Sequence, residues 1–263
     1  MKHLNQFITE YIIKKKLETP IDSEYKYHPQ TKDELIENIK ELLDKGETDL
    51  NCIDTIDITD MSNLFKDLDV IKDNNFDVSD WNVSNVKNMS QLFYDCINFN
   101  CDLSKWNISN VTNIQNMFEG CESFEGKGLE KWDVYNIENM NNMFKYCRSF
   151  DGKSIENCDV SNVKNMKSMF YSCHILNCDL SKWDVSHVES MSNMFFECKN
   201  FEGNGIDKWD VSNVNNMDFM FYACKKFKNN NLKNWNTNKL EHTFNMFHNC
   251  TSLKNKPRLI HKK

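Results

Sequence analysis

A tandem repeat of 25 or 26 residues is the feature that most constrains this chain. The segment WDVSNVNNMDFMFYACKKF, residues 209–227, returns as near-copies along most of the sequence. Tryptophan holds one position in every copy except one, where Cys158 stands instead; the tryptophans are Trp81, Trp106, Trp132, Trp183, Trp209 and Trp235. Such a period predicts stacked units, each of which buries its apolar side chains against its neighbours.

Two further positions recur in step with the tryptophan. In each copy a phenylalanine follows a leucine or methionine, and a cysteine comes three residues later. The phenylalanines are Phe93, Phe118, Phe144, Phe170, Phe195, Phe221 and Phe247, and the cysteines are Cys96, Cys121, Cys147, Cys173, Cys198, Cys224 and Cys250. Columns of one apolar residue type predict a core. We therefore expect Trp106 to Trp235 to be buried, the alternative being a ligand-stacking ladder, and the thiols to be reduced and slow to react.

The pattern within one copy predicts a strand followed by a helix. Ile206, Trp209 and Val211 approach the alternation of a short strand. The apolar residues after them recur at helical spacing, namely Val214, Met217, Met220, Phe221 and Cys224. The predicted fold class is an α/β repeat solenoid, with a short parallel strand and a short helix in each 25/26-residue coil. Because helices pack about 8–10 Å apart and strands about 4.8 Å apart, we expect the stack to curve with its helices outermost.

Three segments are expected along the chain. Residues 1–19 show helical spacing of apolar residues and predict an N-terminal amphipathic helix. Residues 20–49 form a connector and a second helix, which begins at the capping box from Thr31 to Glu34 and ends at Gly46. Residues 50–263 form the repeat solenoid and a short C-terminal tail. Because an open end of a stack exposes core side chains and unpaired backbone groups, the second helix is expected to cap it.

Charge and hydropathy limit the class of partner. The formal net charge of −7 disfavours nucleic acid, since phosphate binding depends on clustered Lys and Arg. The basic C-terminal end, which includes Lys225 and Arg258, is interpreted as a solvated end. No run approaches the ~20 apolar residues of a membrane span, and residues 1–16 lack the features of a signal peptide. The expected partner is a protein, and self-association is left open.

Cysteine usage indicates a reducing compartment. Seven of the eleven cysteines occupy one column, as buried thiols do, and neither a CxxC pair nor a histidine column accompanies them. No metal and no cofactor are therefore expected, with a metal ladder along the column as the minor alternative. The expected location is cytoplasmic or otherwise reducing; the alternatives are a virion-associated protein or one exported without a signal peptide.

The repeat resembles a known family. Its pattern L-x-x-W-D-V-S-N-V-x-N-M-x-x-M-F-x-x-C-x-x-F is similar to the BspA-like leucine-rich-repeat family of bacterial surface proteins and mycoplasma-type lipoproteins, over about residues 50–253. Residues 27–65 are similar to the usual lead-in of that family. The resemblance implies a leucine-rich-repeat-like solenoid used for adhesion or protein contact, without enzymatic activity or cofactor. The chain departs from the surface members in lacking an export signal or lipid-attachment cysteine.

The first ten residues carry a second resemblance. MKHLNQFITE is similar to the capsid-targeting peptides, M-K-x-x-x-x-F-I-x-E, of internal head proteins in tailed phages. Two functions therefore compete: a non-enzymatic protein-binding scaffold, and a structural or packaged component of a larger assembly that is addressed by its N-terminal helix. The motifs of common hydrolases, metalloproteases and phosphate-binding loops do not occur, which disfavours an enzyme.

The candidate partner-binding residues lie where the repeat varies. Positions that are constant in every coil serve folding, so a partner is selected by positions that vary and face outward. The residue after each Leu-Phe or Met-Phe pair varies, and in consecutive coils it becomes Tyr171, Phe196 and Tyr222, with Phe219 nearby. Aromatic residues are enriched at interface hot spots. The alternative is that these rings pack between neighbouring coils.

Overall fold

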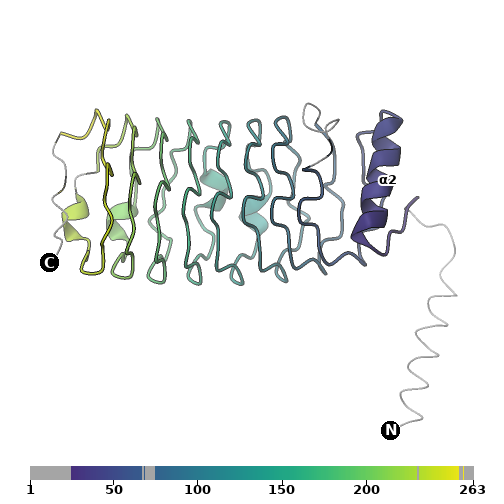
Figure 1. Cartoon of the computed structure of the whole chain (residues 1–263), viewed down its shortest axis with the longest axis horizontal. Helices are drawn as coiled ribbons and strands as arrows, with labels where there is room; N and C mark the ends of the chain where they lie inside the picture. Colours follow the sequence, from purple (N-terminus) through teal and green to yellow (C-terminus); the bar gives the residue numbers. More distant parts are fainter. Residues whose placement is uncertain (1–24, 67, 69–74, 230, 255–256, 258–263) are drawn as a thin grey trace, which may run out of the picture.

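The chain winds into coils that follow one another in a nearly straight row (Figure 1). The computed structural model describes residues 25–66, 68, 75–229, 231–254 and 257. Helix α2 (Lys32–Asp44) lies at the N-terminal end of the row (Figure 1). The predicted amphipathic helix of residues 1–19 lies outside the described residues.

Asparagine and aspartate form the corners of each coil. The Asp210 Oδ1 accepts a hydrogen bond from the Ser212 N–H at 3.0 Å, and the Asn216 Oδ1 accepts one from the Asp218 N–H at 2.9 Å. Equivalent bonds recur in other coils, as from the Ser186 N–H to Asp184. A side-chain oxygen that binds the N–H two residues on reverses the chain. This explains why a repeat so rich in Asn folds at all.

The Met-Phe segment is a run of turns and not a helix. Every second N–H donates to the next coil, as from Met217 to the His242 carbonyl at 2.8 Å and from Phe221 to the Met246 carbonyl at 2.9 Å. The N–H groups between them bond within the coil, as from Met220 to the Met217 carbonyl at 3.1 Å. An α-helix needs all of these N–H groups for its own carbonyls. The bonds between coils therefore exclude it.

The predicted α/β solenoid with a strand and a helix in each coil is wrong. Among the described residues α2 is the only α-helix, and coils are joined by isolated parallel bridges such as Asn165 to Ser190 in place of a sheet. After Asn165 the bridge is cut short by an Asx corner, in which the Lys167 N–H bonds Asn165, and by the left-handed Ser168. The predicted curvature is also absent, since no layer of helices widens one side of the row (Figure 1).

The 26-residue coils carry their additional residue in short 3-10 turns. These are η1 (Leu129–Lys131), η2 (Lys153–Ile155), η3 (Ile206–Lys208) and η4 (Asn231–Asn234). Gly205 opens η3 with φ of 81°, and a Cβ on it would lie 2.3 Å from the Ser181 backbone nitrogen in the preceding coil. Glycine is required there by both backbone conformation and space.

Helix α2 covers the first coil, as the sequence predicts. The Thr31 hydroxyl accepts a hydrogen bond from the Glu34 N–H at 3.2 Å, and Gly46, with φ of 77°, follows the last turn. The Glu34 carboxylate accepts from Gln30 instead of Thr31, so the reciprocal half of the capping box is shifted by one residue. The apolar face is buried in the common core through Leu35, Ile39, Leu42 and Leu43.

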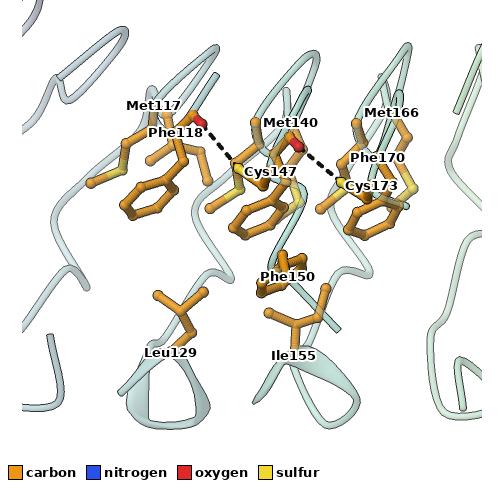
Figure 2. Packing of buried hydrophobic residues seen from close by; sticks show 14 of the residues in the cluster. Met117, Phe118, Leu129, Met140, Cys147, Phe150, Ile155, Met166, Phe170 and Cys173 are labelled. Carbon is orange, nitrogen blue, oxygen red and sulfur yellow. Dashed lines mark hydrogen bonds between the residues drawn. The ribbon is translucent and has the colours of Figure 1, made fainter. Parts of the chain in front are cut away.

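The core consists of columns in which one residue type stacks on itself. Phenylalanine rings of successive coils lie 5.5–5.9 Å apart between centroids along the whole row from Phe65 to Phe247. Figure 2 shows part of this column, with the thiols of Cys147 and Cys173 directed at carbonyls of the preceding coil. Neighbouring coils thus supply both the apolar contacts and the hydrogen bonds that one coil lacks.

Candidate functional site

The tryptophans belong to the core, which confirms the sequence prediction. Trp106, Trp132, Trp183, Trp209 and Trp235 are only 2–7% exposed. Each indole N–H donates to a backbone carbonyl of the preceding coil at 2.9–3.3 Å. The buried indole therefore satisfies its one polar group within the stack. The column is not a ligand-stacking ladder, and it is interrupted where Cys158 replaces tryptophan.

The cysteine column is also part of the core. The thiols of Cys121, Cys147, Cys173, Cys198, Cys224 and Cys250 donate to phenylalanine carbonyls of the preceding coil at 2.8–3.0 Å. All eleven cysteines are free thiols. Burial raises the pKa of Cys121, Cys198 and Cys224 well above the usual value of 9.0. Neutral thiols of this kind are poor nucleophiles and poor metal ligands.

The variable position after each Phe forms a continuous row of rings on the surface. We call Tyr171, Phe196, Tyr222 and His248 the aromatic row. Ring centroids are 4.4 Å apart from Tyr171 to Phe196, 4.6 Å from Phe196 to Tyr222 and 5.2 Å from Tyr222 to His248, with planes within 18° of parallel. The first three side chains are half-buried. Because each ring covers its neighbour's face, what the row presents to a partner is a set of ring edges.

Phe219 and Phe244 extend the aromatic row sideways. Phe219 lies 6.0 Å from Tyr222 and 6.4 Å from Phe196 between ring centroids, and it meets Phe244 edge-on at 5.2 Å. Phe244 is 65% exposed, the largest exposure among the bulky apolar side chains of the described residues. The Phe219–Phe244 pair therefore adds exposed apolar surface beside the half-buried rings.

Phe219 also carries backbone strain. Its φ of 56° is left-handed, and every other coil has a small polar residue or glutamine with the same conformation there: Asn63, Gln91, Asn116, Asn142, Ser168, Asn193 and Asn245. A bulky residue in this region costs of order 1–3 kcal/mol, whereas asparagine tolerates it. The left-handed backbone at this position favours asparagine, but this coil has phenylalanine there. Strain of this kind is a common mark of a functional site.

A lysine borders the row at its other end. The Lys145 ammonium lies 5.1 Å from the Tyr146 ring centroid and 5.7 Å from that of Tyr171, and it pairs with the Glu119 carboxylate at 2.9 Å. Burial lowers the pKa of Lys145, but its hydrogen bond and ion pair with Glu119 outweigh this, so the net pKa shift is upward. Tyr146 stacks edge-on against Tyr171 at 5.5 Å. One protonated amine is thus held over two rings.

All four sequence-predicted site residues come together, and the sequence reasoning missed three others. Tyr171 contacts Phe196, and Phe196 contacts both Tyr222 and Phe219, so the four rings form one connected group. Tyr146, Phe244 and Lys145 were not singled out. Phe244 falls in a column of mostly small polar residues such as Ser90 and Ser192, and that exception was the signal. Tyr146 gave a weaker signal, because its contact with Tyr171 depends on the conformation of the turn.

Within the described ranges, no three His, Cys, Asp or Glu residues gather as metal ligands would. None of the helices described is long and apolar enough to cross a bilayer. The arrangement of stacked rings, an exposed phenylalanine and a bordering lysine is suited to contact with another surface.

Fold and surface together define a repeat protein, in which 25- or 26-residue coils stack through shared columns of Phe, Trp and Cys. The chain matches the family described as "Mycoplasma protein of unknown function, DUF285" in three overlapping segments, residues 34–154, 114–205 and 147–259. These segments span most of the sequence, and the chain belongs to this family. The mycoplasma-type part of the resemblance is thereby confirmed.

Among solved structures, the chain is similar to one in "Crystal structure of TLR13-ssRNA13 complex", with 9% sequence identity and a TM-score of 0.24. The similarity covers 85% of this chain and 48% of that chain, so the chain spans about half of that protein's length. A likeness this weak carries no conclusion about fold or ligand. No curated protein matches the chain.

Proposed function

We propose that this protein is a non-enzymatic protein-binding scaffold of the BspA-like leucine-rich-repeat kind, which contacts its partner through the aromatic row together with Phe219 and Phe244. The observation that carries the proposal is Phe219. A strained, half-exposed ring stands where the fold favours asparagine, and it lies against the most exposed phenylalanine described. Folding does not account for either residue, whereas partner binding accounts for both.

The charge around the row supports a partner with a mixed surface. The ring edges and Phe244 offer apolar contact, and Lys145, though paired with Glu119, offers a cation at one border. Interfaces of this composition bury aromatic anchors at the centre and keep charges at the rim. In this proposal the protein works in a reducing compartment, which the free thiols of the core support.

The test compares two exposed aromatic positions. A double variant, Phe219→Asn with Phe244→Ser, restores the residue types of the other coils and removes both rings. The matched control is Tyr135→Ser, because Tyr135 is 52% exposed at another corner, where other coils carry serine such as Ser109. We expect the double variant to fold with an unchanged melting temperature and to lose the partner that the wild type and the control retain in affinity capture from the native host.

The same experiment separates the competing function. A chain that lacks residues 1–19 is expected to keep the partner, since the row lies far along the chain from that segment. If the truncated chain loses its partner or its place in a particle while the double variant keeps both, the address function is supported and the scaffold proposal is overturned.

A further inference from the structure

The tryptophan column has one gap, and the gap is an apolar notch. Cys158 stands where the other coils place an indole, and its side chain is half-buried. We call the space beside it the Cys158 notch. Its walls include Trp132 and Trp183 from the two neighbouring coils, Phe144, and the methionines Met143 and Met169. Nearly all atoms that line it are carbon or sulfur, so the notch offers a water molecule few partners.

The neighbouring coils indicate the shape that fits the notch. Where two coils in succession carry tryptophan, the indoles lie parallel, 6.5 Å apart and within 7° for Trp106 and Trp132, and 6.5 Å apart within 6° for Trp183 and Trp209. Trp132 and Trp183 each stack on only one other indole, and both line the notch. A planar ring in the notch would restore the spacing on both sides.

A backbone carbonyl marks where the nitrogen of that ring belongs. The carbonyls of Leu103, Ile155, Leu180 and Ile206 each accept an indole N–H from the next coil. The equivalent carbonyl opposite Cys158 is that of Leu129, which accepts only the backbone N–H of Trp132 at 3.1 Å. It keeps an acceptor site that all of its counterparts use. The notch therefore pairs an apolar slot with a single hydrogen-bond acceptor.

The size of the notch requires some adjustment on binding. The centre of a water-sized sphere can move within about 20 Å³ of the notch, little more than one water needs, and the space free of atoms reaches about 290 Å³ when the open mouth is counted. Methionine side chains are flexible and adapt readily to irregular spaces. Rotation of Met143 and Met169 would widen the slot for a ring that enters from the mouth.

We propose that the Cys158 notch binds an indole-type ring, a planar aromatic group with one N–H donor. The ring stacks between Trp132 and Trp183 and donates its N–H to the Leu129 carbonyl. Such a ring comes either as a small molecule or as a tryptophan side chain of a partner. This site is separate from the aromatic row and does not depend on the function proposed for it.

Binding of indole to the full chain tests the proposal. We expect indole, followed by ligand-detected NMR, to bind the wild type and to slow alkylation of Cys158 by iodoacetamide, measured by mass spectrometry. We expect 1-methylindole, which lacks the donor, to bind at least several-fold more weakly. Cys158→Trp should fill the notch, raise the melting temperature and abolish the binding of indole. Cys158→Leu places a smaller apolar side chain without an N–H donor in the notch, and it should abolish indole binding as well.

A second notch made elsewhere is the matched control. Trp209→Cys removes an indole between Trp183 and Trp235 and exposes the Leu180 carbonyl, so indole should bind there too and recover part of the lost stability. N-acetyltryptophanamide distinguishes the two sources of the ring: binding equal to that of indole supports a partner's side chain, and binding of indole alone supports a small molecule. Indole that fails to bind the wild type up to its solubility, or that binds Cys158→Trp equally well, overturns the proposal.

Discussion

The buried phenylalanine column and the aromatic row are adjacent in the sequence, but they differ in burial and in how constant their residues are from coil to coil. Phe170, Phe195 and Phe221 repeat in every coil, are fully buried and stack 5.6 Å apart. The residues directly after them stack even more closely, at 4.4–4.6 Å, but stay half-exposed and give way to Glu119 and Lys145 in earlier coils. Close stacking alone therefore does not identify a core residue. Constancy along the repeat together with burial does.

The largest effect is expected at high pH, where the buried thiols of the core titrate. Burial raises the pKa of eight thiols in the folded state, namely Cys101, Cys121, Cys147, Cys158, Cys173, Cys178, Cys198 and Cys224. Well below the unfolded pKa of about 9 these thiols are protonated in both states, and they leave the stability constant. Above that pKa the unfolded chain releases protons that the folded chain keeps, so the free energy of unfolding falls by roughly 1.4 kcal/mol per pH unit for each thiol.

Urea unfolding at pH 8, 9, 10 and 10.5 measures this slope. The double variant Cys198→Ser with Cys224→Ser is the control. Serine does not titrate in this range, so the variant should lose about a quarter of the slope that the eight thiols produce. A free energy of unfolding that stays constant to pH 10.5 would show that the column is open to water.

Replacing one phenylalanine at a time compares how much a ring of the buried column and a ring of the aromatic row each contribute to stability. Phe195→Ala opens a cavity in the column and is expected to cost about 3–5 kcal/mol. Phe196→Ala removes a half-buried ring and is expected to cost about 1 kcal/mol. Chemical denaturation of both variants gives the two values. Equal costs would mean that the aromatic row belongs to the core, which was the alternative open at the level of sequence.

The indole hydrogen bond has a smaller expected effect. Trp209→Phe keeps an aromatic ring in the column but removes the N–H that donates to the Leu180 carbonyl at 2.9 Å. That carbonyl still accepts the backbone N–H of Trp183, so the cost is expected to be about 1–2 kcal/mol and not the full penalty of a buried unpaired group. Thermal unfolding monitored by circular dichroism measures it. A change above the cost of Phe195→Ala would contradict this assignment.

The smallest expected effect falls on Phe219. Phe219→Asn relieves the left-handed strain of about 1 kcal/mol or more but loses ring contacts with Tyr222 and Phe244, so the free energy of unfolding should change by less than about 1 kcal/mol. Asn193→Phe, at the same position one coil earlier, is the reverse control and should destabilise. Strong destabilisation by Phe219→Asn would assign Phe219 a structural role.

The sequence predicted which residues share each buried column but not the backbone conformation of the segment that carries them. The spacing of Val214, Met217, Met220 and Phe221 is the same in a helix and in a run of turns, because both place these side chains on one face. The decisive fact is where the N–H of residues such as Met217 and Phe219 goes, and it goes to the next coil. A bond between residues 25 or 26 positions apart leaves no local trace in the sequence.

The roles of the asparagines also could not be predicted from the sequence. The abundance of Asn is visible in the sequence, and its caps were assigned to short helices. In the folded chain Asn216 turns a corner, Asn193 adopts the left-handed conformation, and Asn213 donates its amide to the Ser186 carbonyl of the preceding coil at 2.6 Å. Three roles share one residue type, and only the position in the coil separates them.

The sequence by itself determined the period, the buried columns, the capping helix and the variable position that carries Tyr171, Phe196 and Tyr222, because all of these follow from the order of apolar and polar residues. The tertiary structure alone decided that the coils are built of turns, that Phe219 is strained beside Phe244, and that the missing indole at Cys158 leaves the Leu129 carbonyl with an open acceptor site. Each of these depends on contacts between coils, which exist only once the coils are stacked.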